Sequence, residues 1–132
     1  MINAKSLLFA LASIAASQVA FAGAENCKDV DIHVDNQLSD NVKVVDIEYY
    51  DSTKRGTNWR KENGVAAKVV NHGDSKKVYT RNLEEVLNDS KMKVKVKYKR
   101  DNGRGWDKGV WSRASEAKTC VKGAKYTVVL GS

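Results

Sequence analysis

Five lysines occupy every second position of one short stretch: Lys91, Lys93, Lys95, Lys97 and Lys99. Side chains two residues apart in a β-strand share one face and lie about 6.8 Å from each other, so the ammonium groups would form a cationic row. That spacing is below the Debye length of about 8 Å at physiological salt, and the lysines therefore repel one another. The row is either a solvated strand face that discourages pairing with other chains or a surface for an anionic partner.

Acidic residues on a neighbouring strand would determine how much of the positive charge of the lysine row remains. The segment around Asp46 and Glu48 alternates apolar and polar residues, with Val45 and Ile47 on the opposite phase. If this acidic strand lies beside the lysine row, ion pairs between the two strands will cancel part of the positive field.

A tight turn is expected directly after the lysine row. The sequence Asp-Asn-Gly at residues 101–103 favours a three-residue hairpin loop with Gly103 in the left-handed conformation. In that register Tyr98 pairs with Trp106 on the inner face, so Trp106 is expected in the core. The lysines then lie on the outer face.

Trp111 would lie opposite Lys93 on this outer face. A tryptophan among cations suits a membrane interface, a sugar phosphate or an acidic protein surface. Alternatively, Trp111 covers the edge of the core. On the first interpretation the predicted binding residues are Lys93, Lys95, Lys97, Trp111 and Arg113.

The first residues are typical of a secretory signal peptide. Lys5 precedes an apolar run at residues 7–16, and Ala20-Phe21-Ala22 has the small-x-small pattern of a cleavage site. The run is shorter than the roughly 20 residues of a membrane-spanning helix, so no transmembrane segment is expected. We expect cleavage after Ala22, or after Ala24. The remaining single domain, residues 23–132, would be secreted or periplasmic, with a net charge of +6 once Lys5 is removed.

The two cysteines, Cys27 and Cys120, predict one disulfide bond in an exported protein. It would close a loop of 94 residues, counted from Cys27 through Cys120. The chain-entropy account of such a loop gives about 4–5 kcal/mol of stabilisation. The spacing does not match a redox-active Cys-x-x-Cys motif, so the role is structural.

The rest of the chain predicts an all-β fold. Period-two alternation recurs in about seven or eight short segments separated by turns, which is typical of an antiparallel β-sandwich of immunoglobulin-like or transthyretin-like architecture. Asn63-Gly64 favours a two-residue hairpin turn. One short helix is expected at residues 82–90, as a crossover between strands, with Asn82 as its cap and Glu85 three residues later. The strand order does not follow from the sequence.

Residues for catalysis or metal binding form no recognisable pattern. His33 falls on the polar phase of an expected strand, and His72 falls in an expected turn. Asp29, Asp31 and Asp35 alternate beside His33, but their spacing is not that of a calcium-binding loop. No serine lies in a Gly-x-Ser-x-Gly motif. We therefore expect no enzymatic activity, no metal and no cofactor.

The charge of the chain narrows the class of partner. The net charge is +7 and the isoelectric point about 9.4, which favours an anionic surface or an acidic protein. Nucleic acid is disfavoured, because the chain has no recognition motif and is expected to be exported. The first hypothesis is a non-enzymatic binding domain for lipopolysaccharide, anionic lipid or an acidic glycan, including peripheral membrane contact. The alternative is an inhibitor or immunity protein that binds an acidic enzyme or toxin.

Overall fold

The computed structural model describes residues 27–50, 59–83, 86 and 91–131. The predicted signal peptide lies outside these residues. The described part of the chain contains ten strands and no helix, which confirms the all-β class. It therefore also contains no helix with the length and apolar character of a membrane span.

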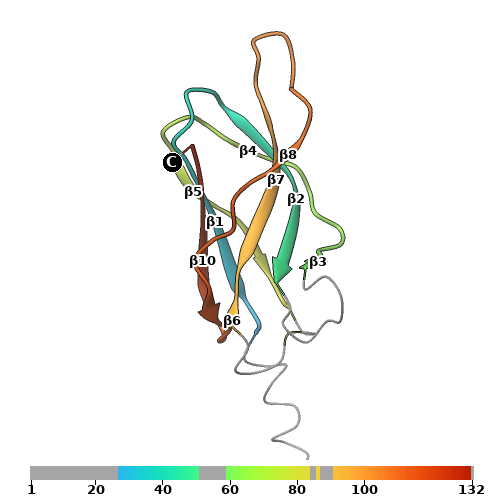
Figure 1. Cartoon of the computed structure of the whole chain (residues 1–132), viewed down its shortest axis with the longest axis vertical. Coiled ribbons are helices and arrows are strands. Elements are labelled where there is room, and N and C mark those ends of the chain that lie inside the picture. The colour runs from blue at the N-terminus through green and yellow to red at the C-terminus, as the bar shows by residue number, and fades with distance from the viewer. Residues whose placement is uncertain (1–26, 51–58, 84–85, 87–90, 132) are drawn as a thin grey trace, which may run out of the picture.

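Two larger sheets and one small ribbon make up the fold (Figure 1). In the first sheet β1 (Val30–Asn36) is central and pairs in parallel with β10 (Lys125–Leu130) and antiparallel with β5 (Ser75–Arg81). The small ribbon pairs β6 (Lys91–Met92) with β9 (Lys118–Thr119).

In the second sheet β2 is the longest strand and holds the others together. Its partner along one edge is β7, and β7 in turn pairs with β8; the other edge pairs with β3 and β4. All of these pairings are antiparallel. The bounds are β2 (Val42–Tyr50), β3 (Trp59–Lys61), β4 (Lys68–Val70), β7 (Val94–Arg100) and β8 (Val110–Trp111).

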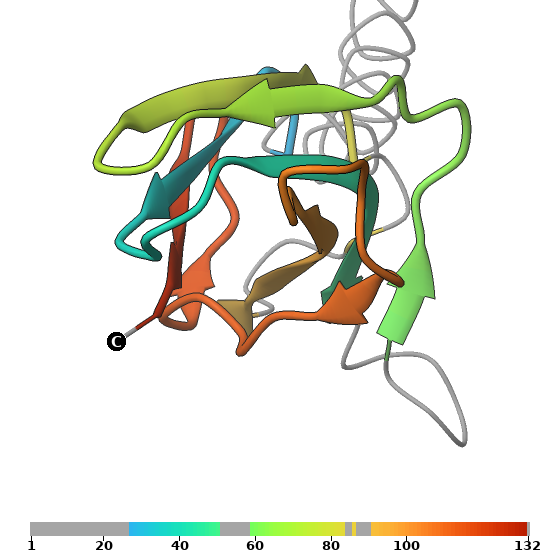
Figure 2. The ribbon, with the colours of Figure 1, turned by 90° about the horizontal axis from the view of Figure 1, so that it is seen from above.

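One hydrophobic core lies between the two larger sheets, which curl around it (Figure 2). The predicted alternation is confirmed in β1, where Val30, Ile32 and Val34 are fully buried and the residues between them are partly exposed. The same alternation in β7 buries Val94 and Val96 and turns the lysines away from the core. Burial of branched apolar side chains is the main stabilising term of such a domain.

The predicted helix at residues 82–90 is not observed. Asn82, Leu83 and Val86 have irregular backbone, and the other residues of that segment lie outside the described ones. Instead of capping a helix, the Asn82 side chain accepts a hydrogen bond from the Asp29 N–H at 3.0 Å. Leu83 and Val86 are each 1 % exposed, so their apolar side chains cover the end of the core.

The predicted hairpin at Asn63-Gly64 is wrong. Strands β3 and β4 pair with β2, along the same edge, as two parts of one interrupted strand. Gly64 is left-handed, with a φ of 65°, but it bends a loop that projects from this edge. The loop is tied to the other sheet, because Tyr79 donates a hydrogen bond to the Ala66 carbonyl and Arg81 donates to the Asn63 carbonyl.

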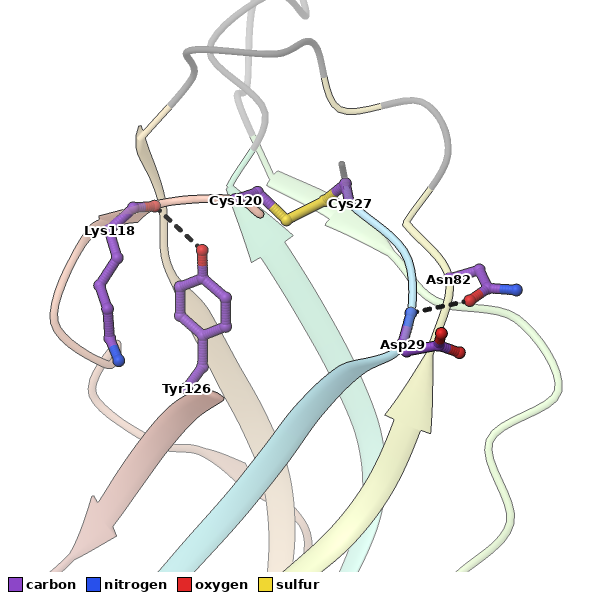
Figure 3. The surroundings of a disulfide bond; sticks show 6 residues. All are labelled: Cys27, Asp29, Asn82, Lys118, Cys120 and Tyr126. Carbon is purple, nitrogen blue, oxygen red and sulfur yellow. Dashed lines mark hydrogen bonds between the residues drawn. A yellow bond between two sulfur atoms is a disulfide. The ribbon is translucent and has the colours of Figure 1, made fainter. Parts of the chain in front are cut away.

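The predicted disulfide between Cys27 and Cys120 is confirmed, with a Cα–Cα distance of 5.2 Å (Figure 3). Both cysteines are buried. Nearby, the Tyr126 hydroxyl donates to the Lys118 carbonyl at 2.9 Å. Structural disulfides form in oxidising compartments, so the bond agrees with a secreted or periplasmic location.

The hairpin between β7 and β8 differs from the predicted register. Lys97 pairs with Trp111, and Asp101 bridges to Trp106. The turn is longer than predicted because the Asn102 side chain accepts the N–H groups of two residues of the turn, Arg104 and Gly105. Gly103 is left-handed as predicted, with a φ of 83°.

We call residues 101–109 the arm, because this loop projects beyond the rest of the molecule (Figure 1). Trp106 lies on the arm and is 36 % exposed, so its predicted place in the core is wrong. The physical reason is its position next to Asp101, past the end of β7, where the opposite sheet no longer covers it.

Candidate binding face

The outer face of the second sheet carries the side chains that alternate with the buried ones of β2 and β7. In the register of these strands, Lys95 lies opposite Glu48 and Lys97 lies opposite Asp46. The acidic strand therefore does lie beside the lysine row. A bulge at Val45 shifts the register, so the third outer pair is Lys43 with Lys99.

Lys95 lies at the centre of this face. Its Nζ is 4.2 Å from the ring centroid of Trp59 and 5.3 Å from that of Trp111. It also forms an ion pair with Glu48 at 3.2 Å, and only 22 % of its side chain is exposed. Lys95 is therefore packed between aromatic rings and does not belong to a simply solvated strand face. Each cation–aromatic contact contributes about 0.5–1 kcal/mol, and more where water is excluded.

The aromatic cluster extends to the end of β2. Lys93 Nζ lies 5.0 Å from the ring centroid of Tyr50 and 5.7 Å from that of Trp59. The two rings meet edge to face, with centroids 5.9 Å apart and planes at 81°, a favourable arrangement of aromatic pairs. The sequence prediction left Tyr50 and Trp59 out of the site. The signal for Tyr50 was present, since it alternates with Asp46 and Glu48.

The structure brings four of the five predicted binding residues onto this face. Lys93 and Lys95 contact its aromatic rings, and Lys97 lies opposite Trp111. Trp111 is 37 % exposed, so its ring both packs on Lys95 and remains accessible. Arg113 follows β8 and lines a shallow groove beside β10, together with residues such as Lys118, Thr127 and Val129.

Positive charge is unevenly distributed along the face. Asp46 forms an ion pair with Lys61 at 3.1 Å, and Glu48 is paired with Lys95. Six lysines and these two carboxylates leave a charge of +4 on this face; the lysines are Lys43 of β2, Lys61 of β3, Lys93 directly before β7, and Lys95, Lys97 and Lys99 of β7. Of these, Lys43 and Lys99 lie opposite each other and not opposite a carboxylate.

The histidines lie elsewhere. His33 is on β1, and its pKa is lowered by burial and by the nearby Lys125 and Lys77 ammonium groups, against the opposing effect of Asp31. His72 lies in the turn between β4 and β5. Within the described ranges, no group of three or more His, Cys, Asp or Glu residues is arranged to hold a metal ion.

Comparison with known proteins adds no relative, since no protein-family model, no curated protein and no solved structure matches this chain. On the outer face an exposed aromatic ring, that of Trp111, lies beside a cation.

Proposed function

We propose that the protein is an exported, non-enzymatic β-sandwich domain whose outer face binds an anionic partner, such as lipopolysaccharide, anionic lipid or an acidic glycan. The observation that carries this proposal is the position of Lys95 between Trp59 and Trp111 on an accessible strand face. The excess of lysines over carboxylates on the same face supports it.

The rings and the charges have different roles in such a site. Exposed tryptophan rings provide apolar contact area with few rotatable bonds, so little conformational entropy is lost on binding. The lysines attract an anion over a longer range and increase the association rate at low salt. Because the rings hold Lys93 and Lys95 in place, part of the face is ordered before a partner arrives.

The test is a binding titration at low and at high salt. The probes are vesicles with and without anionic lipid, lipopolysaccharide, and an acidic glycan. We expect wild-type binding to be confined to anionic probes and to weaken steeply with salt, because mobile ions screen exposed charges. Trp111→Ala should weaken binding with little change in salt dependence, because its ring contributes apolar contact.

Val121→Ala is the matched control. Val121 is 50 % exposed and lies next to the disulfide, so this variant also removes exposed apolar surface but not from the outer face. Binding by Val121→Ala should equal that of the wild type. Equal wild-type binding to anionic and uncharged probes at low salt would contradict the proposal.

The arm favours a second candidate function, inhibition of an acidic enzyme or toxin. Its conformation is set by its own polar side chains: Asp101 accepts the Gly103 N–H, and Asn102 donates to Asp107. A projecting loop that is already ordered loses little entropy when it enters a cleft. The titration distinguishes the two functions once acidic proteins are added as probes, because an inhibitor would bind one of them at a one-to-one ratio and would not bind vesicles or glycans.

A further inference from the structure

The three cross-strand pairs of the outer face are not equivalent. Glu48 faces Lys95 and Asp46 faces Lys97, but Lys43 faces another lysine, Lys99. Directly opposite residues on one face have Cβ atoms about 4.5–5.5 Å apart, and like charges in that position are destabilising. A lysine pair of this kind lowers the stability of the free protein.

The carboxylates near this end of the sheet have other partners. Asp40 accepts two hydrogen bonds from the Arg100 guanidinium, at 3.0 and 2.7 Å. Asp101 accepts the Gly103 N–H, and Asp107 accepts a hydrogen bond from the Asn102 side chain. Asp40 is therefore paired with a cation, whereas Asp101 and Asp107 keep their negative charge; within the described residues, none of the three forms an ion pair with Lys43 or Lys99.

A tryptophan and a valine flank the pair. Lys43 Nζ lies 4.7 Å from the ring centroid of Trp106, which is carried by the arm. On the other side, β4 places Val69 opposite Lys43, and Val69 is 44 % exposed. Strands β2, β4 and β7 meet the arm at this end of the molecule (Figure 1). The two ammonium groups are thus bordered by accessible apolar surface.

We propose that Lys43, Lys99 and Trp106 form a phosphate subsite of the outer face. This inference rests on the proposed function and names the group that the anionic partner presents. A phosphomonoester carries a charge of about −1.5 to −2 at neutral pH, which matches two lysine ammonium groups. Lysine binds phosphate as a point charge, and Trp106 provides contact with the sugar or lipid that carries the phosphate.

The alternative location, around Lys95 and Lys97, is less suited to a dianion. There the nearby carboxylates of Glu48 and Asp46 would repel a phosphate, and the Lys95 ammonium is already paired. Phosphate binding between Lys43 and Lys99 would instead relieve the repulsion between them. The lysine pair therefore lowers stability in the free state and favours the bound state, as is common for functional residues.

Two double variants test the subsite. The first is Lys43→Gln with Lys99→Gln, and its matched control is Lys77→Gln with Lys122→Gln. Both remove two charges, but the two control lysines are exposed residues outside the outer face, on β5 and between β9 and β10. The probes are inorganic phosphate, phosphatidic acid vesicles, phosphatidylglycerol vesicles, which carry a phosphodiester, and lipopolysaccharide.

We expect the first variant to lose about tenfold or more in affinity for the phosphomonoester probes, with a weaker salt dependence, because charge-assisted hydrogen bonds are lost. The control variant should lose about threefold or less. The first variant should also melt at or above the wild-type temperature, which excludes unfolding as the cause. If the protein binds inorganic phosphate but neither vesicles nor lipopolysaccharide, the ligand is a free phosphate. If it binds vesicles and lipopolysaccharide as well, the ligand is a phosphate carried by a lipid.

An equal or larger loss in the control variant would overturn the subsite, and so would unchanged affinity in the first variant. If the wild type binds anionic probes and Trp111→Ala weakens that binding while Lys43 and Lys99 have no effect, the subsite is wrong and the proposed function stands. If the wild type binds no anionic probe at low salt, both are wrong.

Discussion

The two ends of the molecule are stabilised in opposite ways. At one end the Cys27–Cys120 bond, the buried Leu83 and the hydrogen bond of Tyr126 close the core. At the other end the arm projects into solvent, and Lys43 faces Lys99.

The difference indicates that the disulfide end contributes mainly to stability and the arm end mainly to binding. The disulfide end combines covalent, apolar and hydrogen-bonding interactions, and all of them favour the folded chain. The arm end contains two lysines that repel each other and an exposed tryptophan. Neither feature is required for the chain to fold. Substitutions at the disulfide end should therefore reduce stability and leave binding intact, whereas substitutions at the arm end should reduce binding and leave stability almost unchanged.

The largest expected effect is that of removing the disulfide. Replacing Cys27 and Cys120 by serine should lower the free energy of unfolding by about 4 kcal/mol, because the unfolded chain is no longer restrained by a closed loop of this length. Urea denaturation of the wild type and the variant measures the difference. The folded variant should bind anionic probes with wild-type salt dependence; two titratable thiols in the native wild-type protein would contradict the prediction.

A smaller effect is expected for Tyr126→Phe, which removes the hydrogen bond to the Lys118 carbonyl. At neutral pH the variant should be less stable by about 1 kcal/mol. Burial raises the pKa of Tyr126 to about 12. The unfolded chain therefore ionises this phenol near pH 10 while the folded chain keeps its proton, so stability is lost as the pH rises from about 10 to 12.

The same pH range contains a second tyrosine. Tyr79 has its pKa raised to about 12, mainly by burial, with Arg81 acting against the increase. The wild type should thus lose stability above pH 10 through both phenols, and Tyr126→Phe through one. Urea midpoints measured between pH 8 and 11 give the slopes. Equal slopes for the two proteins would mean that Tyr126 ionises as easily in the folded chain as in the unfolded one.

The smallest effect compares two lysines of the same face. Lys99→Gln should raise the free energy of unfolding by about 0.2–0.5 kcal/mol at low salt, because a like-charge pair is removed, and the gain should vanish at 1 M salt, where the Debye length is about 3 Å. Lys95→Gln should instead lower stability, since Lys95 loses contacts with Trp59, Trp111 and Glu48. If both variants changed the free energy of unfolding in the same direction, Lys99 and Lys95 would not differ in their effect on stability, and the comparison would fail.

Local sequence patterns were sufficient to predict part of this structure. Alternation along β7 correctly predicted that its lysines share the outer face, and the two cysteines correctly predicted the disulfide. Both features depend on neighbouring positions or on the number of cysteines. Neither requires knowledge of which strand lies beside which.

Long-range pairing accounts for most of what the sequence could not predict. Glu48 was on the polar phase of its strand, but only the pairing of β2 with β7 places it against Lys95. Asn63-Gly64 has the composition of a hairpin turn, yet one edge of β2 is long enough to pair with both β3 and β4. The β7–β8 register was missed because the Asn102 side chain bonds within the turn and lengthens it.

The parallel pairing of β1 with β10 determines how the protein responds to mechanical force. A pull between Cys27 and Gly131 passes through the disulfide to Cys120, so residues 28–119 lie in a covalent loop that the pull cannot draw out. The load falls on β10, which is drawn along β1 so that all hydrogen bonds of this pairing resist together in shear. Once β10 detaches, the twelve residues after Cys120 can be straightened to a total span of about 40 Å at 3.3–3.6 Å per residue; because β10 is already extended in the fold, the gain in length is smaller than this span.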